Sequence, residues 1–237
     1  MTTDPPSGDP PPEEPPPKDT EARGLRLVAV LLGLTVVSGL IDAVSYLGLG
    51  HVFTANMTGN VVVLGFAAAG APGFSVRHTA TSVACFLAGA LGGGRVTARY
   101  CGGSRRTLTQ VTLAVEALLV GVSAVVAFTA PGTAGMTYTA IALTAFAMGL
   151  RNATVIKLGV PDLTTTVLTR TLTGLAADSR AGGGTGRRSP RRTASVIAML
   201  AGAAFGSWLV MHQGLGTPLL IAAVASGILA AVASGRD

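Results

Sequence analysis

Eight apolar runs, separated by short polar segments, constrain the fold of this chain more than any other feature. A helix needs about 20 apolar residues to cross the roughly 30 Å of hydrocarbon in a bilayer, and six runs come near that length or exceed it. The other two, 54–69 and 163–177, would reach only about 24 Å as helices. The eight runs are residues 25–47, 54–69, 78–96, 108–130, 134–156, 163–177, 193–211 and 217–233. Because backbone polar groups in lipid must be satisfied within each segment, the sequence predicts an all-α, polytopic membrane helix bundle.

The charge content excludes an ordinary soluble domain. Only 12% of the residues are charged, whereas soluble domains are near a quarter charged. A soluble helical bundle would need charged outer faces, and these runs have none. The net charge of +6 is also unevenly distributed, because the first 21 residues carry six acids and one base, whereas the rest carry five acids and 16 bases. A basic, apolar region points to a membrane rather than to nucleic acid.

The segment 1–21 is predicted to be a disordered cytoplasmic tail. Eight of the 13 prolines lie between Pro5 and Pro17, interleaved with acidic residues. Such a segment cannot bury enough apolar surface to offset the entropy lost on ordering. It also lacks the short apolar stretch and cleavage site of a signal peptide. Residues 22–237 form the predicted transmembrane domain.

The transmembrane domain repeats itself. Residues 82–94 align with residues 195–207, and seven of the 13 positions are identical. Upstream, residues 39–43 align with residues 149–153, and the threonine-rich starts of the two short runs follow in the same order. Because three matches occur in the same order, we interpret the domain as two repeat halves, about 24–130 and 134–234.

The arginines and lysines indicate how many runs cross, because cytoplasmic loops carry an excess of both. If all eight runs cross, the basic tail and the four-arginine loop from Arg95 to Arg106 fall on opposite sides. If the two short runs enter and leave on one side, both become cytoplasmic, together with Arg236 and the five-arginine loop from Arg180 to Arg192. The charges favour six crossings of the cell (inner) membrane with both termini cytoplasmic. Pro72 would then lie outside and Pro161 inside.

Three crossings in each half would place the second half upside down relative to the first. The predicted architecture is therefore an inverted 3+3 repeat with one short re-entrant segment or half-helix in each half. Many transporters have this architecture, and their sites lie where the interrupted segments meet. The alternative is that each short run is a short, tilted span.

Four sequence stretches resemble those of a known family. The segments Asp42-Ala-Val-Ser-Tyr-Leu47 and Thr54-Ala-Asn-Met-Thr-Gly-Asn60, with 149–153 and the threonines from Thr164, resemble signature stretches of the YoaK-like bacterial membrane proteins. The resemblance covers about residues 24–234. It implies a bacterial inner-membrane protein of about six spans and of unknown function.

Two acidic residues lie inside predicted spans. Asp42 follows Arg26 by 16 residues, and Glu116 lies about nine residues into its run. An intramembrane carboxylate is costly unless paired or hydrated, so it is a candidate functional group. The alternative for Asp42 is a carboxylate at the outer helix end, facing water. Proton or cation binding is the chemistry that such groups suggest.

The first short run carries two polar pairs. Thr54 with Thr58, and Asn56 with Asn60, are each four residues apart, so a helix would place them in adjacent rows on one side. We expect these rows to line a pathway. The alternative is that they form interhelical hydrogen bonds that hold the bundle together.

The second half places different groups at equivalent positions. Arg151 and Asn152 stand where Ile41 and Asp42 stand in the first half, which predicts one asymmetric site. Further candidates for the pathway or substrate site are Thr165, Thr169 and Arg170. The sequence leaves the pairing open, with Asp42 or Glu116 as the acid and Arg151 or Arg170 as the base.

Two glycine motifs occur at repeat-equivalent positions. Gly89 with Gly93, and Gly202 with Gly206, are spaced for close helix packing, with contact between the two motifs as one arrangement. We expect no metal site or cofactor, since the three histidines share no ligand spacing. We also expect no enzyme, because catalytic signatures such as HExxH and Gly-x-Ser-x-Gly are absent.

These features predict a small transporter or channel-like protein for an unidentified solute or ion. The alternative is a non-transport scaffold or subunit that binds lipid or protein through its arginine-rich cytoplasmic loops. The expected partners are the bilayer and anionic headgroups at the loop from Arg180 to Arg192, where each base contributes about 1 kcal/mol. A second copy of the chain is a candidate partner. Nucleic acid is not expected, because no aromatic residues interleave with the arginines.

Overall fold

The computed structural model describes residues 18–99, 105–158, 168–179, 182–184 and 189–234. Within these ranges the chain is helical and contains no strand. The helices are α1 (Lys18–Gly48), α2 (Met57–Ala68), α3 (Val76–Arg99), α4 (Arg105–Thr129), α5 (Ala134–Leu158), α6 (Leu168–Ala177), α7 (Ser189–Gln213) and α8 (Gly216–Ser234). The all-helical class predicted from the apolar runs is confirmed for the described residues.

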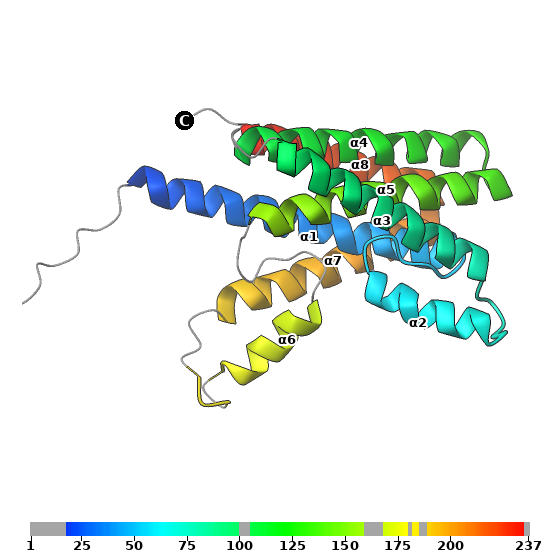
Figure 1. The fold of residues 1–237 in the computed structure, drawn as a ribbon, viewed down its shortest axis with the longest axis horizontal. Helices are drawn as coiled ribbons and strands as arrows, with labels where there is room; N and C mark the ends of the chain where they lie inside the picture. The colour runs from blue at the N-terminus through cyan, green and yellow to red at the C-terminus, as the bar shows by residue number, and fades with distance from the viewer. Residues whose placement is uncertain (1–17, 100–104, 159–167, 180–181, 185–188, 235–237) are drawn as a thin grey trace, which may run out of the picture.

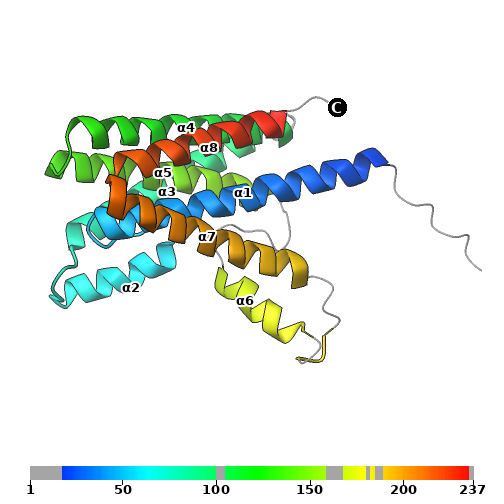
Figure 2. The same cartoon turned by 180° about the vertical axis from the view of Figure 1, so that it is seen from behind.

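The six long helices form one elongated bundle (Figure 1). The closest helix pairs are α1 with α7, α3 with α5, and α4 with α8, and the centre is completed where α4 meets α5 and α1 meets α8. The two short helices each pack on one long neighbour, α2 on α3 and α6 on α7. Figure 2 shows the same arrangement from behind.

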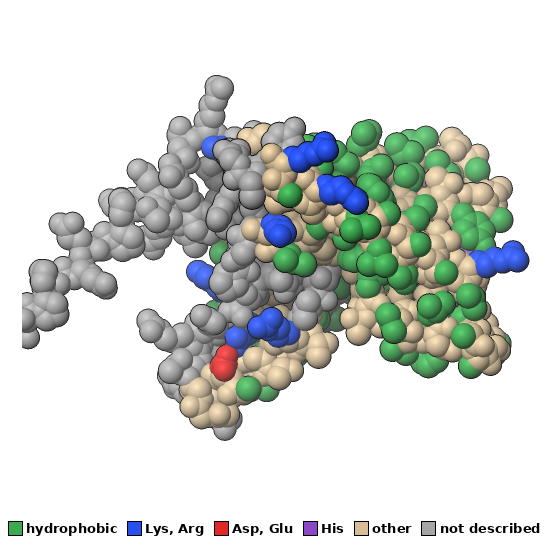
Figure 3. All heavy atoms as spheres, in the orientation of Figure 1, with side chains coloured by type: hydrophobic (Ala, Val, Ile, Leu, Met, Phe, Trp, Pro, Cys, Tyr) green, Lys and Arg blue, Asp and Glu red, His purple; other side chains and the backbone are tan. Residues whose placement is uncertain are grey.

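The two ends of the bundle differ in charge. We call the end that holds the starts of α1, α4 and α7 the basic end, and the opposite end the far end. Figure 3 shows Lys and Arg side chains gathered towards the basic end and hydrophobic side chains over the rest of that face. The described basic residues near the basic end include Arg95, Arg99, Arg106, Lys157 and Arg191, whereas Arg77 lies at the start of α3, at the far end.

The short helices lie on the same flank of the bundle but at opposite ends of it (Figures 1 and 2). At the far end, α1 is followed by a sharp turn in which Gly50 (φ 89°) and His51 (φ 59°) both adopt left-handed backbone angles. Residues 49–56 then run back beside α1, and Leu49, Val52 and Ala55 are buried there. From this position α2 leads out again towards the far end (Figure 1).

Glycines allow the long helices to approach closely. A side chain at Gly89 or Gly93 would collide with the backbone of Phe146 or Leu150 on α5. At Gly202 or Gly206 it would collide with the backbone of α1. Each glycine motif thus packs on a different helix, and the two motifs do not pack against each other.

The outer surface of the bundle is apolar. Leu118 on α4, Leu200 and Met211 on α7, and Ile228 on α8 are each more than half exposed. By length and composition, five described helices suit a membrane crossing, namely the long ones other than α3. Helix α3 has 24 residues, but its glycines, threonines and arginines make it less apolar. These features are those of a multi-pass membrane protein.

Two expected boundaries differ from the structure. Helix α1 begins at Lys18, inside the predicted tail 1–21, whereas residues 1–17 lie outside the described residues. Helix α2 begins only at Met57, with Asn56 as its N-cap. The predicted helical rows therefore do not form, because Thr54 and Asn56 precede the helix. As a result Thr54 is buried and Thr58 is exposed.

Candidate functional site

A buried ion pair lies at the centre of the bundle. Nη1 of Arg151, on α5, lies 2.9 Å from Oε1 of Glu116, on α4. Both side chains are shielded from solvent, with relative exposures of 1% and 0%. Of the four pairings that the sequence left open, the structure contains Glu116 with Arg151. Because removing one partner of such a pair leaves an uncompensated charge, the two residues stabilise the bundle only together.

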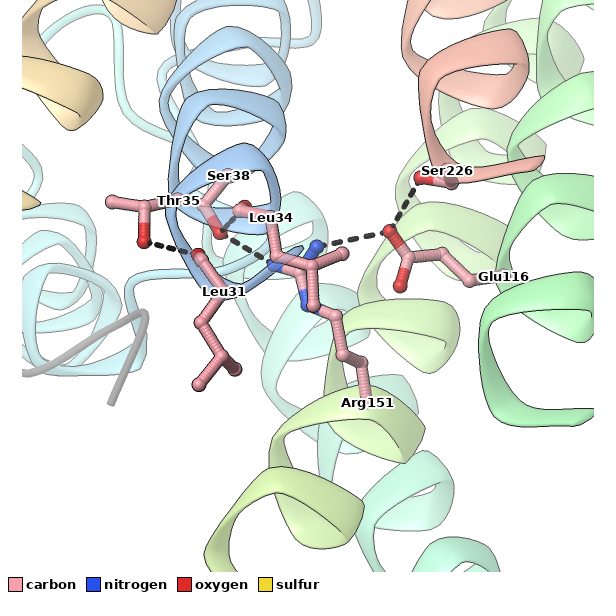
Figure 4. A network of polar contacts seen from close by, with 7 residues as sticks. All are labelled: Leu31, Leu34, Thr35, Ser38, Glu116, Arg151 and Ser226. Carbon is pink, nitrogen blue, oxygen red and sulfur yellow. Dashed lines mark hydrogen bonds and ion pairs between the residues drawn. The ribbon is translucent and has the colours of Figure 1, made fainter. Parts of the chain in front are cut away.

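Two serines from other helices complete this network, which we call the polar junction (Figure 4). Ser38, on α1, accepts a hydrogen bond of 2.5 Å from Nη2 of Arg151 and donates to the carbonyl of Leu34. Ser226, on α8, donates to Oε1 of Glu116 at 2.9 Å. The polar junction therefore joins four helices, namely α1, α4, α5 and α8.

The polar junction is not fully satisfied. Oε2 of Glu116 and Nε of Arg151 are buried and have no hydrogen-bond partner among the described residues. Native proteins pair most buried polar atoms, so each exception requires an explanation. One carboxylate oxygen and one guanidinium N–H are thus available to a ligand, an ion or water.

A small hollow adjoins Arg151 on the side of the basic end. It has room for about one water molecule, about 10 Å³. Thr112 and Thr154 border it with their hydroxyl oxygens 3.1 Å apart, but the surface that its lining residues expose to the hollow is apolar. The hollow is lined by Val30, Leu31, Leu34, Thr109, Thr112, Leu113, Arg151, Thr154 and Val155. A small hollow with an apolar surface thus lies between the polar junction and the basic end.

Asp42 forms a second buried polar site, at the start of the short helix α2. Its Oδ1 accepts hydrogen bonds from the backbone N–H groups of Ala55 at 2.8 Å and of Thr54 at 3.2 Å. Asp42 is 5% exposed, which agrees with the expected buried carboxylate and not with the alternative of a carboxylate that faces water at the helix end. Oδ2 of Asp42 and the hydroxyl of Thr54 are buried without a partner among the described residues.

Asn60 holds the same loop from the other side. Its Oδ1 accepts from the backbone N–H of Phe53 at 2.8 Å, and its Nδ2 donates to the Phe53 carbonyl at 2.6 Å and to Ser82 at 3.1 Å. Ser82 also donates to the Phe53 carbonyl. Asn56 caps α2 by accepting from the N–H of Gly59. The side-chain amides of Asn56 and Asn60 therefore form hydrogen bonds with the backbone. This arrangement matches the alternative in which these residues stabilise the bundle rather than line a pathway.

The candidates of the second half are dispersed. Asn152 is buried on α5, next to Arg151. Thr169 and Arg170 are exposed on α6, so Arg170 does not join the buried ion pair. Thr165 lies outside the described residues.

The arginine-rich loop is described only in part. Arg180, Arg187 and Arg188 lie outside the described residues. Arg192 binds Oδ2 of Asp178 at 2.5 Å and the carbonyl of Gly174 at 2.6 Å. This arginine links α6 to α7, whereas Arg191 is exposed.

Sequence analysis missed four hydroxyl residues of the site: Ser38, Thr112, Thr154 and Ser226. Serines and threonines are common in membrane helices, where they bond to their own backbone, so their type alone carries no signal. Spacing could have found one pair, because Arg151 and Thr154 are three residues apart and share a helix face.

Comparisons with known proteins support a multi-pass membrane protein. The model of a family described as "Protein of unknown function (DUF1275)" matches residues 30–232. The chain is also 35% identical over 149 residues to the UPF0700 transmembrane protein YoaK of Bacillus subtilis (strain 168). That match covers 61% of this chain and 64% of the relative. No solved structure matches.

Proposed function

We propose a transport function for this chain, which belongs to the family described as "Protein of unknown function (DUF1275)". The proposed function is that of a small transporter or channel for a solute or an ion. The polar junction is the proposed point of passage. One observation carries the proposal: a fully buried ion pair at the meeting point of four helices has an unpartnered atom on each side and a hollow beside it. Ionisable groups at such depth in membrane proteins mark ion and substrate pathways.

The proposed architecture is an inverted repeat, and the helix pairs support it. In such a repeat, α1 to α4 are equivalent in order to α5 to α8, so every helix pair should have an equivalent pair. The pair α3–α5 is then equivalent to α7–α1, and α4–α5 is equivalent to α8–α1. The pair α2–α3 is equivalent to α6–α7, and α4–α8 is equivalent to itself. Each of these pairs is present in the bundle.

The glycine contacts support the repeat at the level of single residues. Gly39 packs against the backbone of Met199, and Gly149 packs in the same way against the backbone of Phe86. The glycines are 110 positions apart, and their partners 113. These are the two offsets at which the sequence aligns with itself.

Helix directions support the inversion. Gly202 and Gly206 meet Val36 and Leu40, so α1 and α7 run parallel. The short links after α4 and α7 make α5 antiparallel to α4, and α8 antiparallel to α7. Gly121 faces Ala223 while Gly227 faces Ala117, so α4 and α8 are antiparallel. Together these relations make α5 run opposite to its counterpart α1.

We assign the basic end to the cytoplasm and the bundle to the inner membrane, because basic residues favour the cytoplasmic side. Six long helices cross, and α2 and α6 enter from opposite sides without crossing. Reporter tags test this topology: a tag at Pro72 is expected outside and a tag at either terminus inside. If the tag at Pro72 is found inside, α2 crosses the membrane and the six-span arrangement is wrong.

A flux assay tests transport directly. Purified protein in sealed vesicles is expected to move protons, alkali cations or small anions faster than protein-free vesicles, with each ion tested separately. The variant Glu116→Gln is expected to alter this flux, because it removes one charge of the polar junction. Ser123→Ala is the control, because Ser123 is also buried on α4 but bonds only to its own helix. Absence of any flux, or equal flux in both variants, contradicts the proposal.

The second candidate function is a scaffold that binds anionic lipid, protein or a second copy of the chain through its cytoplasmic arginines. Exposed Arg191 and Lys157 at the basic end favour it. In that case, replacing the arginines from Arg180 to Arg191 with glutamine is expected to abolish binding to anionic vesicles and to partners. The variant Glu116→Gln is expected to leave both kinds of binding unchanged.

A further inference from the structure

The charges buried in the bundle do not balance. Among the described residues, the buried charged side chains are Asp42, Glu116, Arg151 and Arg192. Arg192 is engaged by Asp178, and Arg151 by Glu116. This leaves Asp42 as a second carboxylate, with Arg151 acting on it only at longer range. One positive charge is therefore missing beside Asp42 whenever both carboxylates are ionised.

A proton fits this position better than a metal cation. Oδ1 of Asp42 is covered by the N–H groups of Thr54 and Ala55, and the positive end of the α2 dipole points the same way. These groups repel a cation that must gather several oxygen ligands. A proton needs only one carboxylate oxygen, and Oδ2 is buried and has no partner among the described residues.

Asp42 also holds the re-entrant loop in place. Its two hydrogen bonds from Thr54 and Ala55 tie residues 54–55 to α1, 12 and 13 positions away in sequence. Hydrogen bonds to an ionised acceptor are about twice as strong as those to a neutral one. A proton that bonds to Oδ2 neutralises the carboxylate, so it weakens both bonds and the attraction to the start of α2. The Asn60 contacts to Phe53 and Ser82 involve neutral groups and persist.

The second repeat half lacks this titratable group. Asn152 stands 110 positions after Asp42 and has a similar shape, but it has no ionisable proton. Only the re-entrant segment at the far end can therefore respond to a proton at this position.

We infer that Asp42 is a proton-binding site whose protonation releases residues 54–56 from α1, so that the first re-entrant segment acts as a proton-operated gate at the far end. The inference rests on the proposed transport function, because it assigns the coupling ion. The charged or titratable groups of the surrounding elements are few. On α1 after Asp42 and in the turn they are Tyr46 and His51, which contact each other. On the neighbouring helices they include Arg77, His78 and Cys85 of α3, Glu116 of α4, Tyr138 and Arg151 of α5, and His212 of α7; α2 and α8 carry none.

The gate is tested by the reactivity of a cysteine at Ala55, which is 1% exposed. The full chain is prepared with Cys85 and Cys101 replaced by alanine and with Ala55→Cys. Labelling by an aqueous thiol reagent is compared with that of Thr58→Cys, an exposed position on the same segment, which corrects for the pH dependence of thiol chemistry. The ratio of the two rates is expected to rise about tenfold between neutral and mildly acidic pH, since losing the charge from two hydrogen bonds costs roughly 1.4 kcal/mol or more.

The variant Asp42→Asn keeps the hydrogen-bond acceptor but removes the charge. Its Ala55 to Thr58 ratio is expected to be high and independent of pH, whereas Glu116→Gln retains the dependence. Replacing Na⁺ by K⁺ at constant pH is expected to change nothing, and a response to Na⁺ would overturn the assignment of the proton.

If the ratio of the Ala55→Cys and Thr58→Cys labelling rates does not change with pH in protein that retains Asp42, the inference is wrong. This result does not depend on whether the variant Asp42→Asn folds. The labelling requires no transported substrate. Absence of flux in vesicles would therefore contradict the proposed function, and a constant labelling ratio would contradict the proton gate.

Discussion

The two ends of the bundle use equivalent positions in opposite ways. Towards the basic end, Arg151 and Thr154 of α5 border a hollow together with Thr112 of α4. The counterparts of Arg151 and Thr154, 110 positions earlier, are Ile41 and Val44 on α1, and both are buried in the apolar core. Leu31, which also borders the hollow, has Ile141 of the same core as its counterpart.

The positions that determine helix packing differ from the positions that carry polar groups. The repeat contacts require only glycines and small residues at the crossing points, and both halves retain them. Arg151 and Thr154 beside the hollow stand where apolar Ile41 and Val44 stand at the far end, whereas Leu34 of the lining stands where buried Thr144 stands. We interpret the hollow as the open side of a pathway and the apolar core as its closed side.

The largest expected effect comes from breaking the ion pair. Arg151→Met leaves Glu116 buried and uncompensated, which is expected to cost about 3–5 kcal/mol of stability. The same new residue at the equivalent position, Ile41→Met, is expected to cost less than about 1.5 kcal/mol, because it keeps an apolar side chain of similar volume. Denaturation of the detergent-solubilised protein measures both.

The double variant Glu116→Leu with Arg151→Met controls for this effect. It removes both charges, so most of the lost stability is expected to return. If the double variant is as unstable as Arg151→Met alone, the loss reflects packing rather than an unpaired charge.

The helical class and the close helix packing at the glycine motifs could be predicted from the sequence, because apolar length and glycine spacing act over many residues. The helical class, the buried position of Asp42 and the asymmetry of Arg151 against Ile41 followed from these patterns. The rows at Thr54 and Asn56 were predicted wrongly, because polar spacing cannot show that the chain makes a turn at Gly50 and starts α2 only at Met57. The choice of Glu116 as the partner of Arg151 depended on how α4 and α5 pack, which no local pattern encodes.

Equal effects are expected where the ends are equivalent. Gly39→Ala and Gly149→Ala each place a Cβ against the backbone of the partner helix, so each is expected to cost about 1–3 kcal/mol. Gly94→Ala is the control, because nothing lies within 4 Å of a Cβ there. If only one of the two glycine variants is destabilised, the residue-level equivalence of the halves is wrong.

A smaller effect is expected at the edge of the polar junction. Ser226→Ala removes the hydrogen bond to Glu116 and is expected to cost about 1.5 kcal/mol, as for bonds to charged groups. Ser123→Ala, which loses only a bond within α4, is expected to cost less. Equal denaturation curves for the two variants would show that Ser226 does not support the ion pair.

The proposed pathway admits water to the polar junction from the basic end only. Thr154 and Val44 are equivalent in the repeat, similar in shape and equally buried, at 2% and 0% exposure. With both native cysteines replaced, Thr154→Cys is expected to react with a small aqueous thiol reagent, while Val44→Cys stays protected until the protein is denatured. Equal reaction at both positions, or protection of both, would contradict a pathway that is open at the basic end and closed at the far end.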